Sequence, residues 1–104
     1  MAGRKITPKR GDVFLVDFDP TRGAEIQKTR PAVVLQNNIS NKYSPVTIVA
    51  AVTSNTSRHP HPTDVFVSKK EGGLAVDSMV LLNQIRTIDS TRLQKKLGTL
   101  SHTT

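Results

Sequence analysis

The chain has 104 residues, of which 36% are hydrophobic and 22% charged, and this composition predicts one globular domain over residues 1–104 and excludes a disordered chain. It has no cysteine, which excludes disulfides and thiolate zinc sites and favours a reducing compartment, so we expect a cytoplasmic protein. The formal charge of +7 favours a polyanionic partner, most commonly RNA or DNA.

The N-terminal residues 1–9 contain Arg4, Lys5 and Lys9 and are predicted to form a mobile basic tail. They contain no apolar segment of the kind found in signal peptides, and no later apolar run is long enough to cross a bilayer. We therefore expect neither secretion by that route nor membrane insertion.

The first half of the chain predicts two strands separated by a long connection. Residues 10–12 (Arg-Gly-Asp) form a predicted turn, and residues 13–18 follow as an apolar, β-branched run that indicates a buried internal strand. Residues 19–29 contain Pro20 and Gly23 and are predicted to connect this strand to another at residues 31–35.

The second half alternates between turns and strands. Residues 37–45 are polar and turn-rich, and residues 46–52 form an apolar strand. Residues 54–62 interrupt regular structure, and residues 63–68 alternate as a strand with two different faces does. The last predicted elements come after a turn at residues 71–73.

These last elements are a long strand and a short helix. Residues 79–88 predict the strand, and Asp89 or Ser90 is suited to cap a helix that ends at Gly98. The element order predicts a mainly β fold with a short helix, built as a small antiparallel barrel or half-open sheet.

Three extended motifs resemble MazF/PemK toxins. They are Lys9-Arg10-Gly11-Asp12-Val13-Phe14 with Asp19-Pro20, Gly23, Glu25 and Thr29-Arg30-Pro31-Ala32-Val33-Val34-Leu35-Gln36-Asn37; Tyr43-Ser44-Pro45 with residues 47–54 (TIVAAVTS); and residues 77–89 (DSMVLLNQIRTID). The motifs are ordered and spread from about Lys9 to Leu100, so the resemblance covers the whole domain.

The resemblance implies an SH3-like antiparallel barrel of the MazF/PemK/CcdB type that forms a homodimer. It also implies the toxin of a type II toxin–antitoxin system, neutralised by a MazE-like antitoxin. Its activity would be sequence-selective cleavage of single-stranded RNA or mRNA, leaving a 2′,3′-cyclic phosphate and a 5′-hydroxyl and so inhibiting translation and growth. Family members usually continue into a further helix after the position of Leu100, and this sequence has no equivalent segment.

Metal-free RNA cleavage uses the 2′-hydroxyl as nucleophile, so the site must accept its proton and stabilise charge on the phosphorane. The resemblance assigns Arg30 and Thr53 to the catalytic positions. The guanidinium fork of Arg30 suits two phosphoryl oxygens, and the Thr53 hydroxyl can donate to one. Glu25 lies just before Arg30 in the chain and is our candidate proton acceptor.

Basic, amide and aromatic side chains supply the candidates for RNA binding. Phosphate contacts are expected from cations and base contacts from amides and an aromatic ring. The set is Lys28, Lys69, Lys70, Arg86, Gln84, Asn37 and Phe18.

No metal or other cofactor is expected. His59 and His61 flank Pro60 in a turn-forming segment, and only Asp64 lies near enough in sequence to help them hold a metal, so we interpret them as loop residues. Two alternatives stay open: a CcdB-like toxin that poisons gyrase with the same fold, and a non-catalytic barrel that binds nucleic acid.

Overall fold

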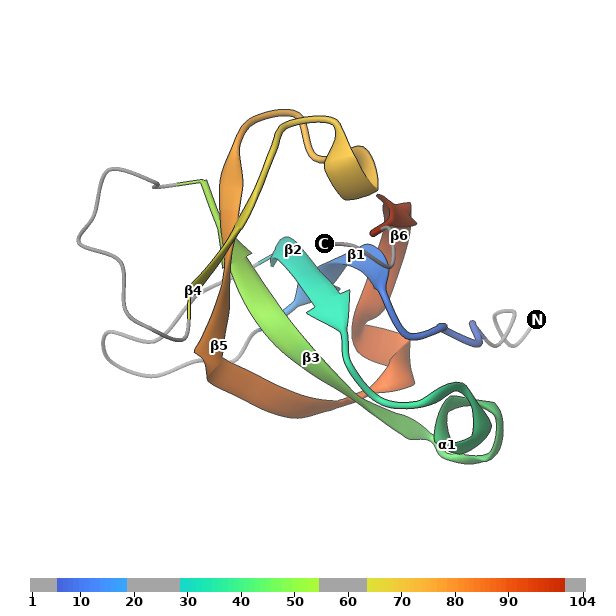
Figure 1. Cartoon of the computed structure of the whole chain (residues 1–104). Coiled ribbons are helices and arrows are strands. Elements are labelled where there is room, and N and C mark those ends of the chain that lie inside the picture. The colour runs from blue at the N-terminus through green and yellow to red at the C-terminus, as the bar shows by residue number, and fades with distance from the viewer. Residues whose placement is uncertain (1–5, 19–28, 55–63, 101–104) are drawn as a thin grey trace.

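The computed structural model describes residues 6–18, 29–54 and 64–100, which form one antiparallel sheet and short helical segments (Figure 1). Six strands form this sheet in the order β4-β5-β3-β2-β1-β6. The strands are β1 (Asp12–Asp17), β2 (Thr29–Val34), β3 (Val46–Thr53), β4 (Asp64–Val67), β5 (Ser78–Asp89) and β6 (Leu93–Thr99). The mainly antiparallel β fold predicted from the sequence is confirmed.

The three strands β1, β2 and β3 bury both of their faces. Alternate residues point to opposite sides of a strand, and here both sides are apolar. The first core cluster contains Phe14, Val16, Phe18, Ala32, Val34, Val49, Ile88 and Leu93. The second core cluster contains Val13, Val33, Ala50, Val52, Val67, Leu74 and Val80. Burial on both faces explains why these strands appear in the sequence as continuous apolar runs.

Strand β5 contributes residues to both core clusters because it bends. Ala51 pairs with Leu81 and Ala50 pairs with Ile85, so the residues Leu82 to Gln84 form a bulge without partners on β3. A bulge bends its strand, and Figure 1 shows β5 changing direction between its two ends. The part before the bulge pairs with β4, and the part after it closes the first core cluster with Ile88.

The last segment of the chain contradicts the sequence prediction. Residues 93–99 form strand β6 and not a helix; Asp89 caps only the 3₁₀ turn η2 (Ser90–Arg92). Two register shifts in the β1–β6 pairing alter the alternation along β6. Leu93 therefore packs in the first core cluster and Leu97 against the second.

The cap itself is well formed, because the backbone N–H and hydroxyl of Thr91 both donate to Oδ1 of Asp89, at 2.9 and 2.8 Å. The backbone hydrogen bond is the main cause that holds the pKa of Asp89 below its usual range, followed by the hydroxyl. Within residues 37–45, predicted as a turn, lies the short helix α1 (Asn38–Tyr43), capped by Asn37.

The N-terminal prediction is wrong for the part that the structure describes. Pro8 is fully buried, and Ile6 packs against the first core cluster. The backbone N–H of Lys9 donates to Asp12 at 2.9 Å, and the hydroxyl of Thr99 donates to the other oxygen of that carboxylate at 2.9 Å. Asp12, only 4% exposed, thus ties the first residues to β6, so Ile6 to Lys9 are not a mobile tail.

Close backbone contact joins β6 to the 3₁₀ turn η1 (Glu71–Gly73). Gly73 has a φ of +78°, and a Cβ there would collide with the Leu97 carbonyl oxygen. A Cβ on Gly98 would lie 2.7 Å from the carbonyl oxygen of Gly72. Only glycines permit this approach, which brings Leu74 into the second core cluster.

We predict that Gly73→Ala lowers the free energy of unfolding by at least about 2 kcal/mol, because it adds a steric clash to backbone strain. Gly11→Ala is the matched control: its φ is +93°, but its Cβ would have no neighbour nearer than 3.7 Å, so it adds strain alone. Urea unfolding measures both variants. An equal loss in the two would contradict the steric part of this argument.

Candidate active site

The predicted catalytic residues Arg30 and Thr53 lie at the same end of two neighbouring strands. Arg30 is the second residue of β2 and Thr53 the last residue of β3. The antiparallel pairing of these strands ends at Ala32 and Ala51, and Arg30 and Thr53 each lie two residues beyond that pair.

The side chain of Arg30 is half-buried, and one of its polar atoms is fully buried. Its Nε is buried and has no hydrogen-bond partner among the described residues. Leaving a buried donor unpaired costs about 1–3 kcal/mol, and more for a charged group. Such a donor is typical of a group that awaits an acceptor from a ligand.

A cavity of about 290 Å³ adjoins Arg30. Its walls come from the start of β2, the end of β3, the segment between η1 and β5, and β6. The lining residues are Arg30, Pro31, Val52, Ser54, Gly73, Leu74, Ala75, Val76, Ser78 and Leu97. Most of the lining side chains are apolar.

Residues 19–28 and 55–63 lie outside the described residues. In sequence, the first segment directly precedes Thr29 of β2 and the second directly follows Ser54. Glu25 and Lys28 belong to the first segment, so their predicted roles lie outside the described residues. The same holds for His59 and His61 in the second.

On β5, Gln84 and Arg86 are both exposed. Gln84 ends the bulge that bends the strand, and Arg86 pairs with Val49. The guanidinium of Arg86 lies 5.4 Å from the centre of the Phe18 ring, within the range of a cation–π interaction. Phe18 itself is only 2% exposed and belongs to the first core cluster, so its predicted contact with an RNA base is wrong for this structure.

Asn37 is a helix cap at the far end of β2 from Arg30. Its side-chain oxygen accepts the backbone N–H of Ser40 at 2.8 Å. The strand separates it from Arg30 by about 20 Å, so the structure does not bring Asn37 to the candidate site. Lys69 and Lys70 are exposed on the turn after β4, as expected for phosphate contacts.

Sequence reasoning missed the apolar walls of the cavity and one exposed aromatic ring. Leu74, Val76 and Leu97 come from segments distant in sequence from Arg30, so no local pattern could have identified them. Phe66 is 54% exposed on β4. The two-faced alternation of residues 63–68 was a usable signal for Phe66, because it places Phe66 opposite to the buried Val67.

The described residues contain no cluster of three or more His, Cys, Asp or Glu side chains that could hold a metal ion. In the same part of the chain, no helix combines the length and apolar character that crossing a membrane requires.

These features define a small antiparallel β protein with a half-buried arginine beside a mostly apolar cavity at one end of its sheet. The chain belongs to the family of PemK-like, MazF-like toxins of type II toxin-antitoxin systems, whose model matches residues 9–104.

Individual relatives agree with this assignment. The chain is 48% identical over 93 residues to a Staphylococcus epidermidis protein named endoribonuclease MazF, covering 89% of this chain and 78% of that protein. A crystal structure of MazF from Deinococcus radiodurans superposes with a TM-score of 0.77 at 26% identity, covering 92% of this chain and 84% of that one. An endoribonuclease from a mycobacterial species shares the fold, with a TM-score of 0.74 at 21% identity over 94% of this chain and 80% of that one.

We predict that Arg30→Met stabilises the fold, or leaves it unchanged, because the substitution removes a buried donor that costs about 1–3 kcal/mol. Urea unfolding measures the change. Arg10→Met is the control, since Arg10 is exposed and its loss should leave stability within about 0.5 kcal/mol of the wild type. A clear loss of stability in Arg30→Met alone would show that the Arg30 side chain is needed for folding.

Proposed function

We propose that this toxin is a metal-independent, sequence-selective endoribonuclease that cuts single-stranded RNA, including mRNA, and thereby inhibits translation and growth. The observation that carries the proposal is the buried Nε of Arg30, which has no hydrogen-bond partner among the described residues and lies at the same end of the sheet as Thr53. The 48% identical relative named an endoribonuclease supports the same activity. A gyrase-binding toxin acts by binding a protein, so it would not require an arginine placed to contact a phosphate.

The reaction begins when the 2′-oxygen of the substrate attacks the adjacent phosphorus. The new 2′-O–P bond forms while the P–O5′ bond breaks, and the departing 5′-oxygen takes a proton from water, which leaves a 2′,3′-cyclic phosphate and a 5′-hydroxyl. Arg30 donates two hydrogen bonds to the non-bridging oxygens, and the Thr53 hydroxyl donates a third. These donors stabilise the charge that develops on the phosphorane, and this contribution is typically about 3–4 kcal/mol per donor.

Glu25 is the proposed acceptor of the proton that leaves the 2′-hydroxyl. Arg30 is poorly suited to that task, because an arginine side chain keeps its proton in proteins and has no site that accepts another. No protein nucleophile and no metal take part in this scheme. The roles of Glu25 and Arg30 are therefore distinct: one carboxylate receives a proton, and one guanidinium stabilises charge.

RNA binding outside the reacting phosphate is proposed to use the exposed basic and amide side chains. Lys28, Lys69, Lys70 and Arg86 supply phosphate contacts, and Gln84 supplies a base contact from the bend in β5. Asn37 and Phe18 are excluded from this surface by their positions at a helix cap and in the core.

We further propose that the toxin acts as a homodimer in the cytoplasm and that a MazE-like antitoxin neutralises it. The net charge of +7 suits an acidic antitoxin segment, which would compete with RNA phosphates for the basic surface. The exposed apolar side chains of the described residues, among them Ile85 and Val76, leave area for contacts between protein chains.

A digest of purified RNA in buffer with EDTA tests the activity. We expect cleavage to continue unchanged, because the proposed chemistry uses only side chains, and the products should carry cyclic phosphate and 5′-hydroxyl ends. Gel analysis followed by end-group labelling measures both. Activity that EDTA abolishes and a divalent ion restores would exclude this mechanism.

Arg30→Met should lower cleavage by at least about a hundredfold, which corresponds to the loss of one strong transition-state donor. The initial cleavage rate of an RNA of defined sequence measures the effect. Arg10→Met is the control, because it removes the same charge from an exposed residue that lies near the end of β2 opposite to Arg30. Near-normal cleavage by a folded Arg30→Met protein would remove Arg30 from the active site.

A further inference from the structure

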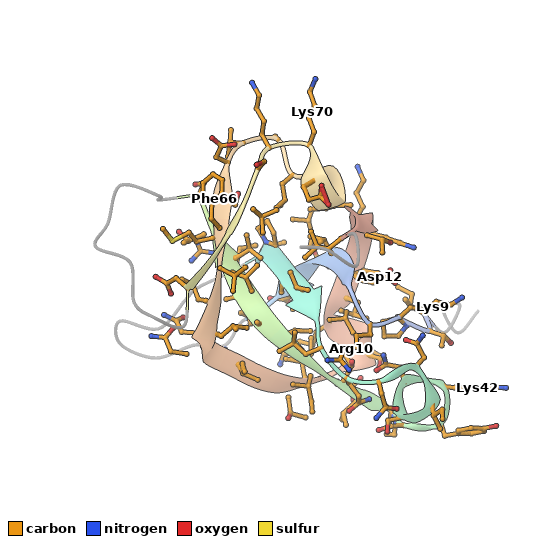
Figure 2. The ribbon with its side chains drawn as sticks, in the orientation of Figure 1. Lys9, Arg10, Asp12, Lys42, Phe66 and Lys70 are labelled. Carbon is orange, nitrogen blue, oxygen red and sulfur yellow. The ribbon has the colours of Figure 1, made fainter. Side chains whose placement is uncertain are left out.

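Phe66 has an aromatic side chain that is exposed to solvent in the folded protein. It lies on β4, an edge strand of the sheet, and is 54% exposed (Figure 2). Its neighbour Val67 is buried in the second core cluster, so β4 is held in place while Phe66 points away from that core. A rigid backbone beneath an exposed ring provides a flat apolar surface that needs no ordering before a ligand binds.

The register sets Phe66 in the same row across the sheet as the candidate catalytic pair. Phe66 pairs with Met79 of β5, and Met79 pairs with Thr53 of β3. Arg30 of β2 lies at the same end of the sheet as Thr53, each two residues beyond the last pair of β2 and β3. Facing residues share one side of a sheet, and three strand spacings amount to about 14 Å. The ring and the reacting centre therefore lie along one line perpendicular to the strands.

Positive charge continues beyond the ring. Lys69 and Lys70 are exposed on the turn that follows β4, and Figure 2 shows Lys70 at the end of the molecule toward which β4 runs from Phe66. A flat ring followed by cations matches the chemistry of a single-stranded polynucleotide, in which bases alternate with phosphates. A duplex would not expose a base face to such a ring.

We propose that Phe66 is a stacking platform for one unpaired base of the RNA, a few nucleotides from the cleaved phosphate, with Lys69 and Lys70 holding the adjoining backbone. This inference rests on the proposed nuclease function and assigns its RNA a path across β3, β5 and β4. Phe66 is a binding residue and not a catalytic one, because it lies too far from Arg30 to touch the reacting atoms. It takes the stacking role for which the buried Phe18 is unavailable.

The first test measures affinity. The probe is a fluorescently labelled 2′-O-methyl RNA that spans the cut mapped with the wild-type protein, which binds without reacting because its nucleophile is blocked. We expect Phe66→Ala to weaken binding by about 5- to 100-fold, the range for loss of one stacked base. Phe66→Trp should retain affinity, and Phe66→Leu should resemble Phe66→Ala, since leucine keeps apolar area but has no ring face.

Tyr43→Ala is the matched control. Tyr43 is 74% exposed on α1, which follows the end of β2 opposite to Arg30, so its loss should leave affinity unchanged. In cleavage assays Phe66→Ala should raise KM and leave kcat nearly unchanged, as expected for a contact made equally in the ground state and the transition state. Equal binding by Phe66→Ala and Tyr43→Ala would overturn the proposal.

The second test locates the stacked base. Removing one base at a time from the probe, with the sugar and phosphate intact, should weaken wild-type binding strongly at one position near the cut. At that position Phe66→Ala should lose nothing further, because the two changes remove the same contact. If the losses from Phe66→Ala and the abasic site add at every position, the ring does not stack on a base.

The remaining outcomes separate this proposal from its alternatives. Sedimentation that shows Phe66→Ala as a monomer beside a dimeric wild type would assign the ring to a contact between two copies, and would overturn the proposal. A wild-type protein that cuts RNA while Phe66→Ala binds it normally would overturn the stacking role alone. A wild-type protein that neither cuts nor binds RNA would overturn the proposed function and this inference together.

Discussion

The burial of both faces of β2 and β3 is the constraint on which the rest of this structure depends. Because Val33 and Ala50 face one cluster while Ala32 and Val49 face the other, either strand can shift only by disturbing two cores at once. That locked register reaches the open end of the sheet. There the two strands carry Arg30 and Thr53, each two residues beyond the pair Ala32–Ala51, so the packing of apolar side chains fixes the strands on which both residues lie.

The glycine contact between η1 and β6 adds the second requirement. With no Cβ on Gly73 or Gly98, two backbone segments approach closely enough to hold the segment before β5 over the sheet. Leu74 then seals the second core cluster, and Val76 and Leu97 form walls of the cavity beside Arg30. Apolar residues far apart in the chain thus lower the local polarity around one guanidinium, which strengthens its attraction for a phosphate.

A buried donor without a partner lowers stability, and the Nε of Arg30 has no partner among the residues that the structure describes. The contrast with Asp12 is informative. That carboxylate is also buried, yet it accepts hydrogen bonds from Lys9 and Thr99 and lies 3.5 Å from the ammonium of Lys96. The fold can therefore satisfy a buried charge where the charge serves structure. The unpaired state of Arg30 is consistent with a group whose partner is a ligand.

The sequence by itself determined the strand composition, because apolar β-branched runs and turn residues act locally, and it identified Arg30 and Thr53 through motifs typical of one toxin family. It failed at residues 93–99, where a capping residue at Asp89 indicated a helix but caps only a 3₁₀ turn before a strand, and at Phe18, whose aromatic ring gave no sign of its burial. Only the tertiary structure decided which aromatic ring is exposed, which walls surround Arg30, and which residues share a row with Thr53. These properties depend on strand pairing and bulges between segments distant in the chain, and such pairings leave no local periodicity in the sequence.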